Sequence, residues 1–207
     1  MTRGDMVAAT LVAVTAFGVY LRTLFPGLGG GGDVAKFQYV GSVLGTPHPP
    51  GYPLYILVSF CFAQIPVGSL AWRMNMMSAF FAVVAVALCY AILVRLGCRR
   101  AVAVAAALAL AFDRYLWSKA VYAEVYSLTA ALVAAIVFFA VRWQATRRDR
   151  DLYVVVGVFA LSLGNHLTVA TIVPGLLAYV LITDHRTIRF RVAAVSAAIV
   201  RLGVAQY

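Results

Sequence analysis

The feature that most constrains the fold of this chain is a series of long apolar segments separated by short charged loops. Of its 207 residues, 64% are hydrophobic and 12% are charged, whereas soluble domains are about half apolar and about a quarter charged. Such segments indicate membrane helices, and they lack the sustained alternation that is typical of membrane strands. The sequence therefore predicts an all-α polytopic membrane protein in a lipid bilayer. The apolar segments cover residues 6–25, 53–68, 75–94, 101–117, 120–141, 152–165, 167–182 and 192–204.

The basic residues follow a pattern that is typical of membrane topology. The net charge is +10, and the arginines lie mainly in short loops between apolar segments. This distribution argues against nucleic acid as a partner and places the arginine clusters in the cytoplasm. The clusters are Arg95, Arg99 and Arg100; Arg142, Arg147, Arg148 and Arg150; and Arg186, Arg189 and Arg191.

The spacing of these clusters predicts where the chain turns. Residues 101–141 cross the membrane twice with a turn near 112–119, and residues 152–182 cross twice with a turn at 164–166. Each crossing in the second segment spans only roughly 23 Å, less than the ~30 Å hydrocarbon core. We therefore expect the turn at 164–166 to lie below the outer membrane surface, where it lines a protein cavity or a wet cleft. In all, we expect about seven membrane-crossing helices in a single domain of residues 1–207.

The segment 53–68 allows two topologies. If it crosses the membrane, the glycine-rich loop before it is cytoplasmic; if it lies flat or re-enters, that loop is on the outside. Loop charge does not decide between the two. The segment is short for a span and contains Gln64 and Pro66, which favours an interfacial helix. We therefore favour a first outer loop, residues 26–74, that carries horizontal juxtamembrane helices.

On this topology, the outer side collects most of the polar residues that could carry chemistry. The chain has only seven acidic residues, and Glu124 is its only glutamate. Ionisable groups in or beside membrane segments are functional candidates. The polar residues on this side are Asp33, Lys36, His48, Arg73, Asn75, Asp113, Arg114, Lys119, Glu124, Asn165 and His166.

Two stretches of the first outer loop each allow a structural and a functional interpretation. Asp33, after four glycines, could cap a short helix from about Val34 to Leu44, or could accept a proton from an attacking hydroxyl. In "GTPHPPGYP", residues 45–53, the prolines favour an extended segment followed by a helix start. His48 is then either a loop residue or a partner for phosphate or a proton.

Two further positions also allow both a structural and a functional interpretation. Glu124 could extend to the lipid headgroups or serve a site. Lys119 is five positions away, a poor spacing for one helix face, so we expect the partner of Glu124 to lie on another helix. Asn165 and His166 form either a helix cap and turn or a buried polar group that needs partners.

Four motifs in order resemble a known membrane-protein family. They are "GDVAKFQYVGSVLGTPHPPGYPLY", "RMNMMSAFFAV", "LWSKAVYAEVYSL" and "LSLGNHLT", and the resemblance covers nearly all of residues 20–182. The family includes transmembrane protein 260, a protein O-mannosyltransferase, and is similar to the wider GT-C glycosyltransferases. The resemblance implies a GT-C-like helical bundle whose first outer loop carries the catalytic acid. The C-terminal helices and outer domain of the family are absent here, so we expect a truncated chain or a fragment.

The resemblance also assigns roles to individual residues. It implies that Asp33 is the catalytic acid. The sequence shows no convincing metal cluster, so we expect that no metal or other cofactor is needed. Many family members carry an acid where this chain has Lys36, which leaves open either a loss of activity or a phosphate-binding role for Lys36. The residues that match the family's motifs and are implied to bind substrate are His48, Pro49, Tyr52, Glu124, Asn165 and His166. We further expect cations to neutralise the leaving phosphate, and the candidates are Lys36, Arg73, Arg114 and Lys119.

The function implied by the resemblance is that of an integral membrane glycosyltransferase. It would transfer a sugar such as mannose, with inversion, from a polyprenyl-phosphate donor to a protein or glycan hydroxyl. The expected location is a bacterial plasma membrane with the active site on the outer face. Two alternatives stay open: a carrier or transporter of the polyprenyl-phosphate sugar, and an inactive fragment of a larger transferase.

Overall fold

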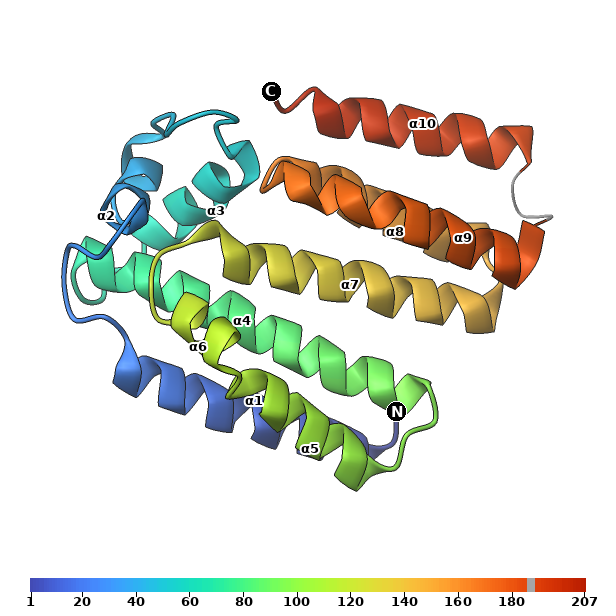
Figure 1. The fold of residues 1–207 in the computed structure, drawn as a ribbon, viewed down its shortest axis with the longest axis horizontal. Coiled ribbons are helices and arrows are strands. Elements are labelled where there is room, and N and C mark those ends of the chain that lie inside the picture. The colour runs from blue at the N-terminus through green and yellow to red at the C-terminus, as the bar shows by residue number, and fades with distance from the viewer. Residues whose placement is uncertain (186–188) are drawn as a thin grey trace.

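A computed structural model describes residues 1–185 and 189–207, with the side chain of Arg191 excepted; Arg186 of the third arginine cluster lies outside it. The described residues form α-helices and short 3₁₀-helices without strands, which confirms the all-α prediction (Figure 1). The elements are α1 (Arg3–Thr23), α2 (Val34–Phe37), η1 (Val40–Val43), α3 (Pro53–Ala63), α4 (Leu70–Arg95), α5 (Arg100–Ala111), α6 (Arg114–Ala120), α7 (Val125–Thr146), α8 (Asp149–Leu163), η2 (Leu167–Ile172), α9 (Val173–Asp184) and α10 (Phe190–Val204).

The helices indicate an integral membrane protein with fewer spans than expected. Within the described residues, four helical segments are long and apolar enough to cross a membrane: α1, α4, α7 and the η2–α9 segment. A fifth is added if α5 and α6, which are bent by 62°, form one broken span. The expected seven crossings are not supported, because α8 and α10 have 15 residues each and rise only about 22 Å.

The bundle has two distinct ends. The N-terminus and the arginine-bearing ends of α4 and α7 lie at one end, and α2 and α3 lie at the other (Figure 1). The helix α3 has 11 residues and rises about 16 Å, so it is too short to cross a ~30 Å core. This length agrees with the interpretation that the segment 53–68 does not span the membrane.

The centre of the bundle is α4, which packs against α1, α3, α5, α6 and α7. Much of this packing is made by small side chains, among them Ala16 of α1, Ala79 and Ala82 of α4, and Ala107 of α5, all of which are fully buried. Small residues let helix backbones approach closely, which is the usual basis of packing between membrane helices. The resulting frame fixes the first turns of α4 and α7 beside the loop segments that precede them.

A glycine brings the first loop against α3. A Cβ atom added at Gly41 of η1 would lie 2.6 Å from the Cβ and 3.2 Å from the carbonyl carbon of Ser59. Neither atom belongs to a flexible side-chain end, so α3 and η1 would have to separate.

We expect Gly41→Ala to lower the stability of the chain by about 1–3 kcal/mol, the usual cost of overpacking. Thermal unfolding in detergent measures this effect as a lower midpoint temperature. Gly157→Ala in α8 is the matched control, because a Cβ atom there meets nothing within 4 Å. That control should unfold at the wild-type temperature or slightly above it, since alanine favours helix more than glycine does. Equal midpoints for the two variants would contradict the prediction.

Candidate functional site

The first part of the site is the short helical segment that follows the four glycines. Asp33 occupies the N-cap position of α2, but its side chain caps no backbone N–H, so only the position of the expected cap is right. The expected single helix from Val34 to about Leu44 is instead two short turns, α2 and η1. The Asp33 carboxylate is therefore available for other side chains, and about half of it is exposed.

Asp33 lies between two basic side chains. The Lys36 ammonium donates to Asp33 Oδ1 at 2.8 Å, and His48 Nε2 lies 3.7 Å from Asp33 Oδ2. The hydrogen bond from Lys36 is the largest cause that lowers the pKa of the Asp33 carboxyl below its usual value. The acid is therefore ionised at neutral pH.

His48 connects this ion pair to the start of α3. Its Nδ1 lies 3.2 Å from Lys36 Nζ, and its Nε2 lies 2.9 Å from the Tyr52 hydroxyl. The buried Phe37 ring meets both the His48 and Tyr52 rings edge-on. His48 is thus part of a polar cluster and not a simple loop residue.

The proline stretch starts a helix as the sequence predicts, but residues 48–51 form a turn and not the expected extended segment, because the Gly51 amide donates to the His48 carbonyl at 3.0 Å. Pro53 occupies the first turn of α3, and the Pro49–Pro50 peptide bond is cis. Tyr52, immediately before α3, has a left-handed backbone conformation with φ of 51°. Pro49 shapes the loop that carries His48, whereas Tyr52 contributes its side chain.

The turn predicted at residues 164–166 approaches the same cluster from α8. The Gly164 carbonyl accepts a hydrogen bond of 2.8 Å from the Leu54 amide of α3, and the His166 ring lies 5.9 Å from the Tyr52 ring. Burial lowers the pKa of His166, which keeps the imidazole neutral at pH 7. Its Nδ1 accepts from the backbone amide of Thr168, so His166 has the partner that a partly buried histidine needs.

Asn165 is fully buried and fastens this turn to α7. Its side-chain amide donates to the Val125 carbonyl at 3.1 Å and to Thr129 Oγ1 at 2.8 Å. The oxygen of its side-chain amide has no hydrogen-bond partner among the residues that the structure describes. The turn is therefore both a helix end and a buried polar link between α8 and α7.

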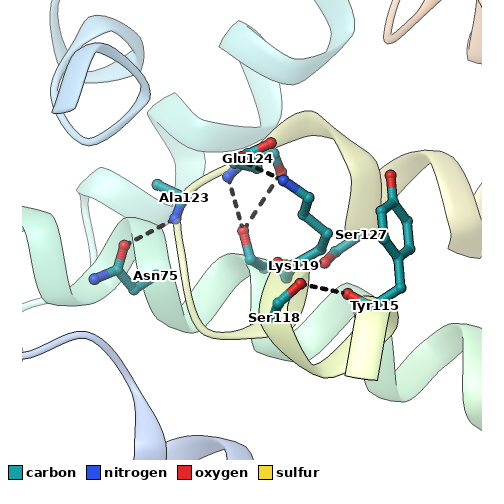
Figure 2. Close-up of polar contacts among 8 residues, drawn as sticks. Asn75, Tyr115, Ser118, Lys119, Ala123, Glu124 and Ser127 are labelled. Atoms are coloured by element: carbon teal, nitrogen blue, oxygen red, sulfur yellow. Dashed lines mark hydrogen bonds and ion pairs between the residues drawn. The ribbon is translucent and has the colours of Figure 1, made fainter. Parts of the chain in front are cut away.

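Glu124 forms the second acidic position of the site, immediately before α7. Figure 2 shows its carboxylate meeting the Lys119 ammonium of α6, at 3.0 Å. The expectation that a five-residue spacing prevents this pair is wrong, because α6 ends at Ala120 and the chain reverses before α7. Lys119 also lies 4.9 Å from the centre of the Tyr126 ring, which in turn contacts His166 at 5.8 Å. These ring contacts join the two acidic positions into one site.

A buried group of hydrogen bonds centred on Asn75 and Gln38, here called the hub, connects the segments that precede the two acids. Asn75 of α4 accepts hydrogen bonds from the Ala123 amide at 2.9 Å (Figure 2) and from Gln38 at 3.2 Å, and it donates to the Phe25 carbonyl at 2.9 Å. Gln38 in turn bonds the backbone at Gly27 and Gly29. The hub therefore fixes the glycine-rich loop relative to the segment that carries Glu124.

Most of the chain matches a known protein family. The model of the protein O-mannosyl-transferase TMEM260 N-terminal domain matches residues 33–189. The chain belongs to the TMEM260 family. The matched region begins at Asp33. Of the residues described above, Phe25, Gly27 and Gly29 lie before it, and the others lie within it.

Two curated relatives show the extent of the similarity. The chain is 31% identical to protein O-mannosyl-transferase TMEM260 of Mus musculus over 156 residues, which is 73% of this chain and 22% of the relative. It is 24% identical to protein O-mannosyl-transferase tmem260 of Dictyostelium discoideum over 150 residues, which is 71% of this chain and 18% of the relative. The chain thus spans about a fifth of the length of these relatives. No solved structure matches it.

Two of the cations expected to bind substrate do not contact the cluster. Arg73 donates to the carbonyls of Ala63 and Ile65, so it holds the C-terminal end of α3. Arg114 is exposed at the start of α6 and makes no hydrogen bond or ion pair within the described part of the chain. The contacts made by Arg73 are structural, whereas Arg114 is free for a ligand.

Several residues of the site were not predicted from the sequence. Gln38, Thr129 and Ser78 are short polar side chains inside apolar stretches, and nothing in the sequence separates them from solvated positions. Tyr126, which the sequence did not single out as a site residue, contacts both Lys119 and His166. Its spacing of two residues from Glu124 was the signal that could have identified it.

Proposed function

We propose that this chain forms the catalytic end of a membrane glycosyltransferase. It transfers a sugar from a polyprenyl-phosphate donor to a hydroxyl of a protein acceptor, and mannose is the sugar that the names of its relatives suggest. The observation that carries this proposal is the Asp33 carboxylate, ionised and half-exposed at one end of the bundle beside Lys36 and His48. That end is opposite the arginine-bearing end, so we place the site on the outer face of the membrane.

The proposed step is a single displacement at the anomeric carbon of the sugar. The acceptor oxygen forms a bond to this carbon on the face opposite the leaving group, and the bond to the phosphate oxygen breaks with its electron pair. Asp33 accepts the proton of the attacking hydroxyl. Its lowered pKa makes it a weak base, which suits a proton transfer that follows most of the bond breaking.

The remaining residues supply charge and shape. Lys36, Lys119 and Arg114 are the cations near enough to the outer end to stabilise the leaving phosphate, as cations do for developing charge on phosphoryl groups. Glu124 and neutral His166 offer hydrogen bonds to sugar hydroxyls. The rings of Tyr52 and Tyr126 flank His166, and the exposed Tyr126 ring gives the sugar an apolar surface.

A transfer assay tests the proposal. The protein expressed from its complete gene is placed in liposomes with a polyprenyl-phosphate sugar that carries a radiolabel on the sugar. We expect label to appear on protein, with release of unlabelled polyprenyl phosphate. Label that stays on the lipid but changes leaflet would instead identify a carrier and contradict the proposal.

A further inference from the structure

Three side chains of the first outer loop form a continuous hydrogen-bonded series. Lys36 Nζ lies 3.2 Å from His48 Nδ1, and His48 Nε2 lies 2.9 Å from the Tyr52 hydroxyl. The Phe37 ring packs edge-on against His48 and Tyr52, at 6.3 and 5.5 Å between ring centres, and holds both rings in place. These two contacts restrict which nitrogen of His48 can carry a hydrogen.

The direction of the series follows from what each group is able to donate. A lysine ammonium is a donor only, so His48 Nδ1 must accept from it and cannot carry a proton. The ring proton is then on Nε2, which donates to the Tyr52 oxygen at 2.9 Å. The other acceptor near Nε2, Asp33 Oδ2, is too far for a hydrogen bond at 3.7 Å. Tyr52 is therefore the acceptor of this bond, and its own hydroxyl hydrogen can be donated to another group.

We infer that Lys36, acting through the tautomer of His48, makes the Tyr52 hydroxyl a hydrogen-bond donor to the ligand. Tyr52 has no second hydrogen-bond partner among the residues that the structure describes, although it is only 6% exposed. Burial and the charge of Asp33 raise the pKa of Tyr52, so the phenol keeps its hydrogen at neutral pH. Lys36 is a positioning residue in this relay, and Tyr52 is the group that touches the ligand.

The ligand group that fits this donor is an anionic oxygen. Lys36 already neutralises Asp33, so an anion that approaches Tyr52 meets a site without net negative charge from that pair. Hydrogen bonds to charged acceptors are the stronger class. The identification of the ligand as the phosphate of a polyprenyl donor rests on the proposed function, whereas the direction of the relay does not.

The first test reads the tautomer directly. The chain has three histidines, so nitrogen NMR of histidine-labelled protein in nanodiscs, with His48→Gln to assign the signal, resolves His48. We expect hydrogen on Nε2 in the wild type and in Lys36→Arg. In Lys36→Glu the carboxylate accepts from Nδ1, so the hydrogen should move to Nδ1. The same tautomer in the wild type and in Lys36→Glu would overturn the inference.

The second test measures whether Tyr52 donates to a phosphate. Farnesyl phosphate is the probe, and calorimetry gives its dissociation constant. We expect Tyr52→Phe to weaken binding by about tenfold or more, as for other hydrogen bonds to charged groups. Tyr39→Phe, at an exposed tyrosine of the same loop, should leave binding unchanged.

The same substitution in a Lys36→Glu background separates the relay from a simple loss of contact. There Tyr52 donates to His48, so Tyr52→Phe should change the affinity for farnesyl phosphate by less than about twofold. Equal losses in the two backgrounds would overturn the inference. The relay and the proposed function can fail independently. If the His48 hydrogen moves to Nδ1 in Lys36→Glu but the wild type transfers no sugar, only the proposed function is refuted.

Discussion

Replacing Asp33 with Asn is expected to lower sugar transfer by about 10²- to 10⁴-fold, the usual contribution of a general base. Asparagine has nearly the same shape as aspartate but cannot take the proton of the acceptor hydroxyl. The fold should survive, because the Asp33 carboxylate is half-exposed and its ion pair with Lys36 lies at the surface, where such pairs contribute little stability. The transfer assay in liposomes, run with protein whose unfolding temperature is also recorded, measures both quantities.

The matched control for this substitution is Asp113→Asn. Asp113 is an exposed acid at the break between α5 and α6, where it caps the amides of Tyr115 and Leu116. Asparagine caps helices as well as aspartate does, so this control removes one negative charge without removing the cap. We expect near-normal transfer. Full transfer by Asp33→Asn, or an equal loss in both variants, would show that Asp33 is not the base.

Much of the helical organisation could be predicted from the sequence because it depends on local physical rules. Apolar segments mark the helices, Pro53 marks the start of α3, and the polar residues at 164–166 mark a turn. The number of spans could not be predicted in the same way. The expected count relied on the arginine clusters, which require the chain to return to one side but do not require each helix to be long enough.

The candidate site was predictable as a set of residues but not as a set of contacts. Motifs placed Asp33, His48, Glu124 and His166 on one side, and the structure connects them through ring contacts and hydrogen bonds. The Lys119–Glu124 pair was missed because helix spacing rules do not apply across a reversal of the chain. Buried polar residues such as Gln38 were missed because burial is set by tertiary packing, which a single sequence does not show.

The second large effect is expected at the buried hub, where Asn75→Leu should lower the free energy of unfolding by roughly 2–6 kcal/mol. The substitution removes the acceptor of the Ala123 amide and one of the two acceptors of the Gln38 side-chain NH₂ group, and both residues are fully buried. Each buried polar group left without a partner costs about 1–3 kcal/mol. Because a domain is stable by only about 5–15 kcal/mol, the variant should unfold at a much lower temperature in detergent.

Asn165→Leu provides the comparison that identifies the cause. Asn165 is as deeply buried as Asn75, but within the described part of the chain its side-chain oxygen lacks a partner and its side-chain NH₂ group bonds the Val125 carbonyl and Thr129. Leucine at this position removes one buried oxygen that already lacks a partner, and it also removes two hydrogen bonds. The loss of stability should therefore be smaller than at Asn75. If burial alone set the cost, the two variants would unfold at the same temperature. A larger loss at Asn75 would instead show that the hub beneath Asp33 and Glu124 holds the outer end of the bundle together through its hydrogen bonds.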